Sequence, residues 1–173
     1  MSALRQLQVR PDLEEDRLLL RIRTGDEQEF QFWLTRHFMK KLWPAMLQSL
    51  GAEVVPPTVA EPARRQALLA FQHEQTLERA NFATPYDENP PQSFPLGAQP
   101  LLVVQAGLRA PQGGTWVLTL RPSSGQGVDL GLDPTLMHGL CKLLSEAAAR
   151  MDWDLDFQVV TTAPGTPPST RLN

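Results

Sequence analysis

The clearest pattern along the chain is a strict alternation of apolar and other residues in two short runs. Every second position of each run is apolar: Leu18, Leu20 and Ile22 in the first, and Phe30, Phe32 and Leu34 in the second. A period of two is typical of a strand that is buried on one face. Residues 24–28 between the runs include Gly25 and Asp26, which favour a turn. The pattern therefore predicts a β-hairpin.

The same alternation predicts how the two strands of the hairpin pair. If Ile22 lies opposite Phe30, all six apolar side chains share one face, whereas a shift by one residue would place three of them in water. In this register Arg23 lies opposite Glu29 on the other face. We expect these two side chains to form a solvent-exposed ion pair, which stabilises a sheet by only about 0.2 to 1 kcal/mol.

The period changes from two to about 3.6 after the hairpin, which predicts a helix that covers the hairpin's apolar face. Thr35 precedes the change and is a suitable N-cap, and Gly51 follows the last apolar residue as the expected C-terminal stop. Pro44 lies inside this helix, and we expect a kink there. The apolar stripe consists of Phe38, Met39, Leu42, Trp43, Met46, Leu47 and Leu50.

The segments around this unit carry weaker patterns. Residues 1–17 contain Leu4, Leu7 and Val9, which predict a short strand or helix before Pro11. Pro62 at a first helical position predicts a second helix from there to about Asn81. Five prolines within 83–100 exclude regular structure there, and the aromatic residues between them favour a segment that packs on the domain over a functional flap.

The second half of the chain predicts an antiparallel meander followed by a helix. Strands are expected over 101–109, 115–121 and 128–132, with glycine-containing turns between them. Asp133 as N-cap and Pro134 as first residue begin the helix. A last strand is expected around Leu155, Phe157 and Val159. The buried stripe of the helix is Leu136, Met137, Leu140, Leu144, Ala147, Ala148 and Met151.

Together these elements predict an α+β fold with a mostly antiparallel sheet, built from a hairpin and a three-stranded meander, and about three helices on one face. A chain of 173 residues is long enough for one domain with a real core. We expect residues 1–160 to form a single domain whose two halves are connected by 83–100. Residues 161–173 have too little apolar surface to offset chain entropy, which predicts a disordered tail.

Composition narrows the class of protein. Sixteen basic and 19 acidic residues give a net charge of −3, whereas a dedicated nucleic-acid-binding domain usually has an overall basic excess. Cys141 is the single cysteine, so no intramolecular disulfide can form and a reducing compartment is expected. The first 23 residues contain no apolar core of signal-peptide length, and no apolar run is long enough to span a membrane. We therefore expect a soluble cytoplasmic protein with no membrane partner.

Positive charge gathers locally around the hairpin and its helix. The candidate anion-binding or partner-binding residues are Arg21, Arg36, His37, Lys40 and Lys41. Four of them fall in the first turns of the helix, where positive charge opposes the helix macrodipole. Such a broken local rule sometimes marks a functional surface, although a solvated face that keeps the protein soluble is the commoner reason for it.

No motif for catalysis, cofactor binding or metal binding is convincing in this sequence. His73-Glu74 begins a zinc-protease pattern, but Leu77 stands where the second histidine belongs. Acidic residues at 152, 154 and 156 imitate a calcium loop that lacks its glycine and its final glutamate. His138 and Cys141 lie one helical turn apart, but a small core thiol is the commoner role. The sequence therefore predicts no catalytic, cofactor-binding or metal-binding residue.

The stretch from Leu18 to Lys41, with a hairpin that ends Trp33-Leu34-Thr35-Arg36 and enters a helix, resembles a family of uncharacterised bacterial proteins. No activity is assigned to that family. The resemblance therefore implies nothing about site residues or reaction.

Three classes of function remain open. The strong packing patterns and the lack of a chemical signature favour a non-catalytic interaction or adaptor domain, with a protein partner or a second copy bound at an exposed strand edge or apolar helix face. The first alternative is a domain that binds nucleic acid or another polyanion through the basic residues. The second is an enzyme whose site forms only when distant segments converge, beneath residues 83–100.

Overall fold

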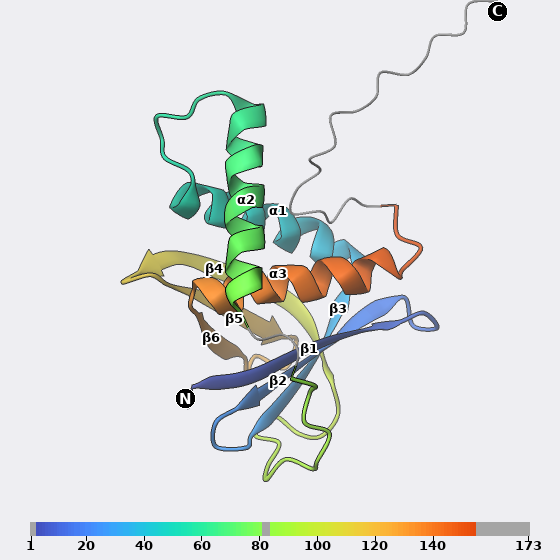
Figure 1. The fold of residues 1–173 in the computed structure, drawn as a ribbon. Coiled ribbons are helices and arrows are strands. Elements are labelled where there is room, and N and C mark those ends of the chain that lie inside the picture. The colour runs from blue at the N-terminus through green and yellow to red at the C-terminus, as the bar shows by residue number, and fades with distance from the viewer. Residues whose placement is uncertain (1–2, 81–83, 155–173) are drawn as a thin grey trace, which may run out of the picture.

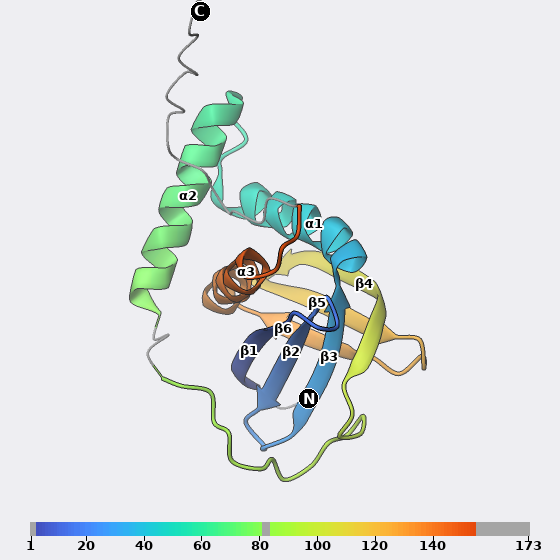
Figure 2. The ribbon, with the colours of Figure 1, turned by 90° about the vertical axis from the view of Figure 1, so that its right-hand side faces the viewer.

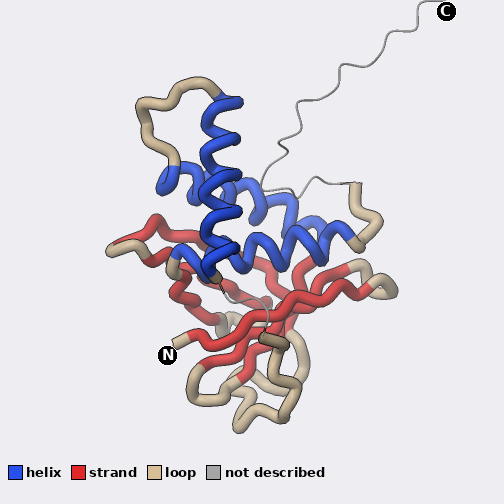
Figure 3. The backbone as a smooth tube through the Cα atoms, viewed as in Figure 1, coloured by secondary structure: helices blue, strands red, loops and turns tan. Residues whose placement is uncertain are grey.

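The computed structural model describes residues 3–80 and 84–154, which form an α+β fold. A sheet of six strands has helices on one side (Figures 1 and 3). The strands lie in the order in which they occur in the chain. They are β1 (Leu4–Asp12), β2 (Arg17–Thr24), β3 (Glu29–Thr35), β4 (Leu101–Gln112), β5 (Thr115–Pro122) and β6 (Val128–Leu132). The helices are α1 (Arg36–Val54), α2 (Pro62–Arg79) and α3 (Pro134–Ala149).

The predicted hairpin register is confirmed. Ile22 pairs with Phe30, Arg23 with Glu29 and Leu19 with Trp33. Phe30 and Phe32 are buried on the helix side of the sheet, as the alternation requires. The N-terminal segment adds β1 to this hairpin as a nine-residue antiparallel strand, which makes the first half a three-stranded meander.

The predicted second meander is also present, with β5 paired to β4 and to β6 in antiparallel fashion. The two meanders join through one parallel pairing, in which Phe32 and Trp33 of β3 lie beside Leu101 and Leu102 of β4. A parallel pair requires a crossover connection, and the segment that carries α1 and α2 provides it. The sheet is therefore mostly antiparallel with one parallel pair.

The core lies between the sheet and the helices. Helices α1 and α3 contact the strands, and α2 packs on α1 and α3 (Figure 2). The predicted stripes of α1 and α3 are buried except for Leu47 and Leu136, which are half-buried. Trp116 of β5 is fully buried, and its indole N–H donates to the hydroxyl of Ser49 in α1 at 2.8 Å.

Of the two predicted ends of α1, the first is confirmed and the second is wrong. Thr35 caps the helix, because its hydroxyl accepts from the backbone N–H of Phe38 at 3.2 Å. Gly51 does not end it: the helix continues to Val54, and the amide of Val55 still donates to the carbonyl of Gly51. Pro56 and Pro57 follow directly, and a residue before proline disfavours helical geometry, so these prolines rather than the glycine stop the helix.

Helix α2 is the least buried of the three helices. It begins at Pro62 as predicted and ends at Arg79. Only Leu69 and Ala70 are buried among its residues, while Phe71 is 54% exposed. None of the helices in the described part of the chain is long and apolar enough to cross a membrane. The predicted strand around 155–159 and the predicted tail at 161–173 lie outside the described residues.

Candidate functional site

Strand β1 forms one edge of the sheet. Within residues 3–80 and 84–154, β2 is the strand that pairs with it. The pairing is regular from Gln6 to Asp12, with a β-bulge between Leu4 and Gln6. A sheet edge of this kind carries backbone N–H and C=O groups that no strand satisfies, and it can accept a further strand.

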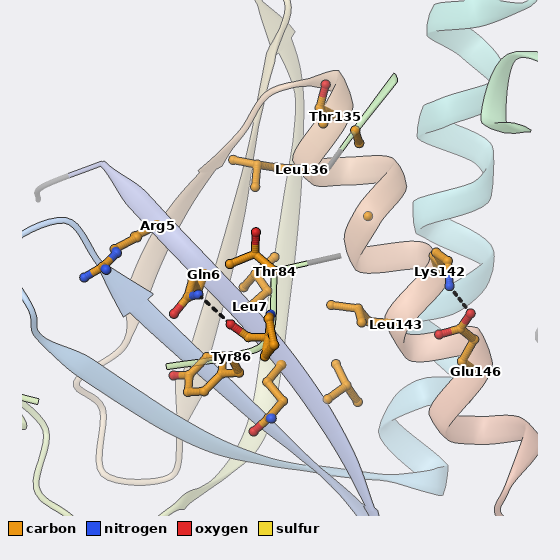
Figure 4. A pocket seen from close by; sticks show the side chains of 15 residues that line it. Arg5, Gln6, Leu7, Thr84, Tyr86, Thr135, Leu136, Lys142, Leu143 and Glu146 are labelled. Carbon is orange, nitrogen blue, oxygen red and sulfur yellow. Dashed lines mark hydrogen bonds and ion pairs between the residues drawn. The ribbon is translucent and has the colours of Figure 1, made fainter. Parts of the chain in front are cut away.

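A groove of about 640 Å³ follows this edge (Figure 4). Residues 5–9 of β1 line one side, and one face of α3 lines the other. Ala80, Thr84, Pro85 and Tyr86, which follow α2, complete the lining. Five strand residues at roughly 3.4 Å each extend about 17 Å, so the lining from β1 is long and narrow. The residues from α3 are Thr135, Leu136, Gly139, Lys142, Leu143 and Glu146.

The helix side of the groove includes apolar side chains that are incompletely covered. Leu7 and Val9 of β1 face the helices but are only half-buried, in contrast to Leu18 and Leu20 of β2, which are fully buried. Leu143 of α3 is also half-buried and points into the groove. The groove thus contains apolar surface that an additional chain would remove from water.

The other side of β1 carries polar side chains that hold the segment after α2. Gln6 donates to the carbonyl of Pro85 at 3.2 Å and accepts from the backbone N–H of Asp87 at 3.1 Å. Arg10 forms an ion pair with Glu88 at 2.5 Å. Residues 85–88 are therefore fastened along the outer face of the sheet, on the side away from the helices.

The expected solvent-exposed ion pair of Arg23 and Glu29 is a wrong prediction. Both side chains are buried, with exposures of 0% and 1%, because residues 86–89 cover them. Arg23 donates to the backbone carbonyls of Asp87 at 2.7 Å and Asn89 at 2.6 Å. Glu29 instead pairs with Arg21, whose Nε lies 3.0 Å from a carboxylate oxygen. The register was right, but the covering segment could not be seen in the alternation.

Arg21 lies at the centre of this polar cluster. Its guanidinium pairs with Glu88 at 2.8 Å and stacks on the ring of Tyr86, 4.5 Å from the ring centre. Burial alone would lower the pKa of Arg21, but hydrogen bonds to Glu88 and Glu29 outweigh it and raise that pKa. Burial and the nearby Glu29 carboxylate raise the pKa of Tyr86. Polar groups thus do gather beneath the proline-rich segment, where they pair with one another.

The five predicted anion-binding residues do not form one surface. Arg21 is engaged on the outer face of the sheet, whereas the other four lie on α1, which covers the opposite face. His37, Lys40 and Lys41 are exposed and Arg36 is half-buried. Within the described residues, none of these four takes part in an ion pair.

Two histidines that are 65 positions apart in the sequence meet between α2 and α3. The Nδ1 atoms of His73 and His138 are 2.8 Å apart, so one ring donates to the other when both are neutral. His138 is 1% exposed, and burial together with His73 lowers its pKa to about 4. Burial and the charge of Lys142 lower the pKa of His73. Burial raises the pKa of Cys141 to about 12, which keeps this neighbouring thiol protonated.

The described residues contain no group of three histidine, cysteine or acidic side chains that could hold a metal ion. A two-histidine contact by itself does not complete a zinc site, which needs at least three protein ligands. The arrangement of His73 and His138 therefore connects two helices.

The groove residues were missed because their pattern is weak in isolation. Leu7, Val9 and Pro11 alternate with Gln6, Gln8 and Arg10, which is a strand with one apolar and one polar face. Pro11 within that run is typical of an edge strand, and this signal could have identified β1 as the open edge. The contribution of α3 depends on tertiary packing, which periodicity cannot reveal.

Comparison with known proteins identifies no relative: no family model, no curated protein and no solved structure matches this chain. The resemblance of the Leu18–Lys41 stretch to an uncharacterised bacterial family remains a prediction.

Proposed function

We propose that this chain is a non-catalytic protein-interaction domain and that its partner binds in the groove between β1 and α3. The observation that supports this proposal most is the half-burial of Leu7 and Val9 beside an edge of β1 that no other strand of the described residues pairs with. Apolar side chains on the buried face of a sheet are normally covered completely, and a bound chain would complete their burial.

The charges near the groove support binding of a protein over catalysis. Lys142 pairs with Glu146, and Arg5 pairs with Glu27. Arg21 is held by Glu29 and Glu88. Each of these ionisable groups already has a partner of opposite charge, which favours a role in holding the walls of the groove in place.

A reducing compartment such as the cytoplasm is the location we propose. The single cysteine of the chain, Cys141, is buried with a free thiol in α3. The protein's fold therefore depends on its core and its ion pairs, with no contribution from an intramolecular disulfide.

Affinity capture with matched variants tests the proposed function. The tagged full-length chain is used to capture proteins from the host cytoplasm, in parallel with its Leu143→Arg and Phe71→Arg variants. Leu143 lines the groove, whereas Phe71 is an exposed apolar residue on α2 outside the groove lining. We expect a specific partner that is retained by Phe71→Arg and lost with Leu143→Arg. Retention by both variants would contradict binding in the groove.

A second candidate function is binding of a polyanion through α1. The exposed His37, Lys40 and Lys41 support it, since no acid of the described residues neutralises them. Filter binding of a nucleic acid over a salt series provides the test, because phosphate contacts make affinity fall with salt. Lys40→Glu/Lys41→Glu should lose this binding, and Arg64→Glu/Arg79→Glu should retain it at the same net charge. Affinity that does not depend on salt would end this idea.

A further inference from the structure

The backbone groups of β1 that face the groove can be assigned from two independent observations. The amide of Thr24 donates to Gln28 at 3.0 Å, so Thr24 directs its backbone toward β3. Alternation in an antiparallel ladder then directs Arg23, Arg21 and Leu19 toward β1, where their partners are Gln6, Gln8 and Arg10. The intervening residues of β1 must therefore direct their N–H and C=O groups away from β2.

Pro11 supports the same assignment. It pairs with Leu18 inside the ladder although proline has no N–H to donate. A proline is accommodated in an edge strand where its nitrogen faces away from the neighbouring strand. Leu7 and Val9 lie four and two positions before Pro11 and share its orientation, so their N–H groups face the groove, and no backbone acceptor for them lies within residues 3–80 and 84–154.

Both ends of the open edge are unsuited to further pairing. The bulge between Leu4 and Gln6 distorts the edge at one end, and Pro11 removes a donor at the other. The usable stretch is therefore short and lies within Gln6–Arg10. Since long edges favour uncontrolled association, this arrangement permits one short strand and discourages open-ended aggregation.

We propose that β1 binds a short extended segment of a partner protein as an additional strand, through the N–H and C=O groups of Leu7 and Val9. This inference rests on the proposed function and specifies how the partner binds. The groove is lined by α3 on one side, and Thr84, Pro85 and Tyr86 also contribute to its lining. A groove of about 640 Å³ beside a short strand edge fits a single extended chain.

The walls of the groove define the chemistry of the segment. Side chains that point toward α3 would meet Leu7, Leu136 and Leu143, so they should be apolar. Side chains at the alternate positions would meet Gln6, Gln8 and Tyr86, so they should be polar. The preferred partner sequence therefore alternates apolar and polar residues over about four or five positions.

Selection from a phage-displayed library of random heptapeptides tests this inference. We expect the selected peptides to share the alternating pattern. Amide hydrogen exchange measured by NMR on the full chain should show that a selected synthetic peptide slows exchange at Leu7 and Val9. Val9→Pro should weaken its binding about tenfold, since it removes one groove-facing donor, whereas Val9→Thr should bind within about twofold of the native chain.

The outcomes separate this inference from the proposed function. A peptide that is lost with Leu143→Arg but binds Val9→Pro at full affinity would overturn strand addition and leave groove binding in place. Failure to select any peptide, or selected peptides without alternation, would also overturn it. A homodimer in sedimentation that Val9→Pro dissociates would assign the edge to a second copy and refute the partner segment. The exchange measurement on the native chain remains decisive if Val9→Pro fails to fold.

Discussion

Arg23 shows that the burial of a side chain can depend on a segment that is distant in the sequence. Its place opposite Glu29 follows from the alternation of the hairpin, but its burial follows from the covering segment that contributes the carbonyls of Asp87 and Asn89. These carbonyls compensate a buried cation that would otherwise be costly. Arg23 thus connects the first hairpin to a segment more than sixty residues away.

Replacement of Arg23 by alanine should destabilise the domain by about 3 kcal/mol, because the backbone carbonyls of Asp87 and Asn89 lose their donor and the acids around the guanidinium lose their counter-ion. Urea denaturation measures this change. Arg10→Ala is the matched control on the same face, since its ion pair with Glu88 is exposed, and it should cost less than about 1 kcal/mol. Similar losses in both variants would contradict the burial of Arg23.

His138 predicts a specific dependence of stability on pH. The pKa of His138 is about 4 in the folded chain, below the ordinary value of 6.5. His138 therefore binds a proton more readily in the unfolded chain than in the folded chain. The stability that neutral His138 contributes is fully present above pH 6.5 and is lost as pH falls toward 4. Between pH 7 and pH 5 this loss amounts to about 2 kcal/mol.

The His138→Gln variant should lose much less stability over the same pH interval, because glutamine does not titrate. Urea midpoints at pH 7, 6 and 5 compare the two proteins. Lys142 is the charged group that acts on the histidine pair, through His73. Parallel pH profiles for the native chain and the variant would show that another group governs the acid sensitivity.

At the scale of elements, the glycines before and within β6 have different roles. A Cβ at position 127 would lie 2.3 Å from the carbonyl oxygen of Leu120, whereas one at position 131 would make an ordinary contact of 3.7 Å with Thr115. Gly127 therefore allows the turn between β5 and β6 to pack closely. This difference depends on the approach of the turn to β5, which the sequence alone does not show.

Gly127→Ala should destabilise the domain by about 1 to 3 kcal/mol through overpacking, while Gly131→Ala should be tolerated within about 1 kcal/mol. Thermal unfolding followed by circular dichroism compares the two variants. The opposite order would mean that the turn before β6 does not approach β5 as described.

The orientation of the backbone groups of β1 also leads to a prediction about stability. Gln8→Pro removes an N–H donor that faces β2 and should lower the free energy of unfolding by about 3 kcal/mol. Val9→Pro removes an N–H donor that faces the groove and should lower it by about 1 kcal/mol. Chemical denaturation measures both. Equal costs would contradict the assignment of the groove-facing groups and with it the proposed strand addition.

Several elements could be predicted because their signals are local. The caps at Thr35 and Asp133, the register of the first hairpin and the buried stripes of α1 and α3 depend on residues that are near in sequence. The end of α1 was misplaced because Gly51 carried the expected signal while Pro56 and Pro57 determined the stop. β1 was left undecided because its leucines are too few to establish a period.

At the scale of the whole molecule, the features that could not be predicted from the sequence are those that form the groove. The parallel pairing of β3 with β4 depends on the crossover through α1 and α2. The position of α3 beside β1 depends in turn on the complete sheet. His73 and His138 meet only as a consequence of that packing, which connects α2 to α3. The candidate site is therefore a product of topology, assembled from β1, α3 and the residues after α2.

Photo-crosslinking inside the host cell tests the central claim most directly, that this groove is where a partner protein binds. A photoreactive amino acid is placed at position 143 in the groove and, separately, at position 71 on the exposed side of α2. We predict one discrete adduct with a partner protein from position 143 and none from position 71. Adducts from position 71 alone, or no adduct from either position, would contradict the account.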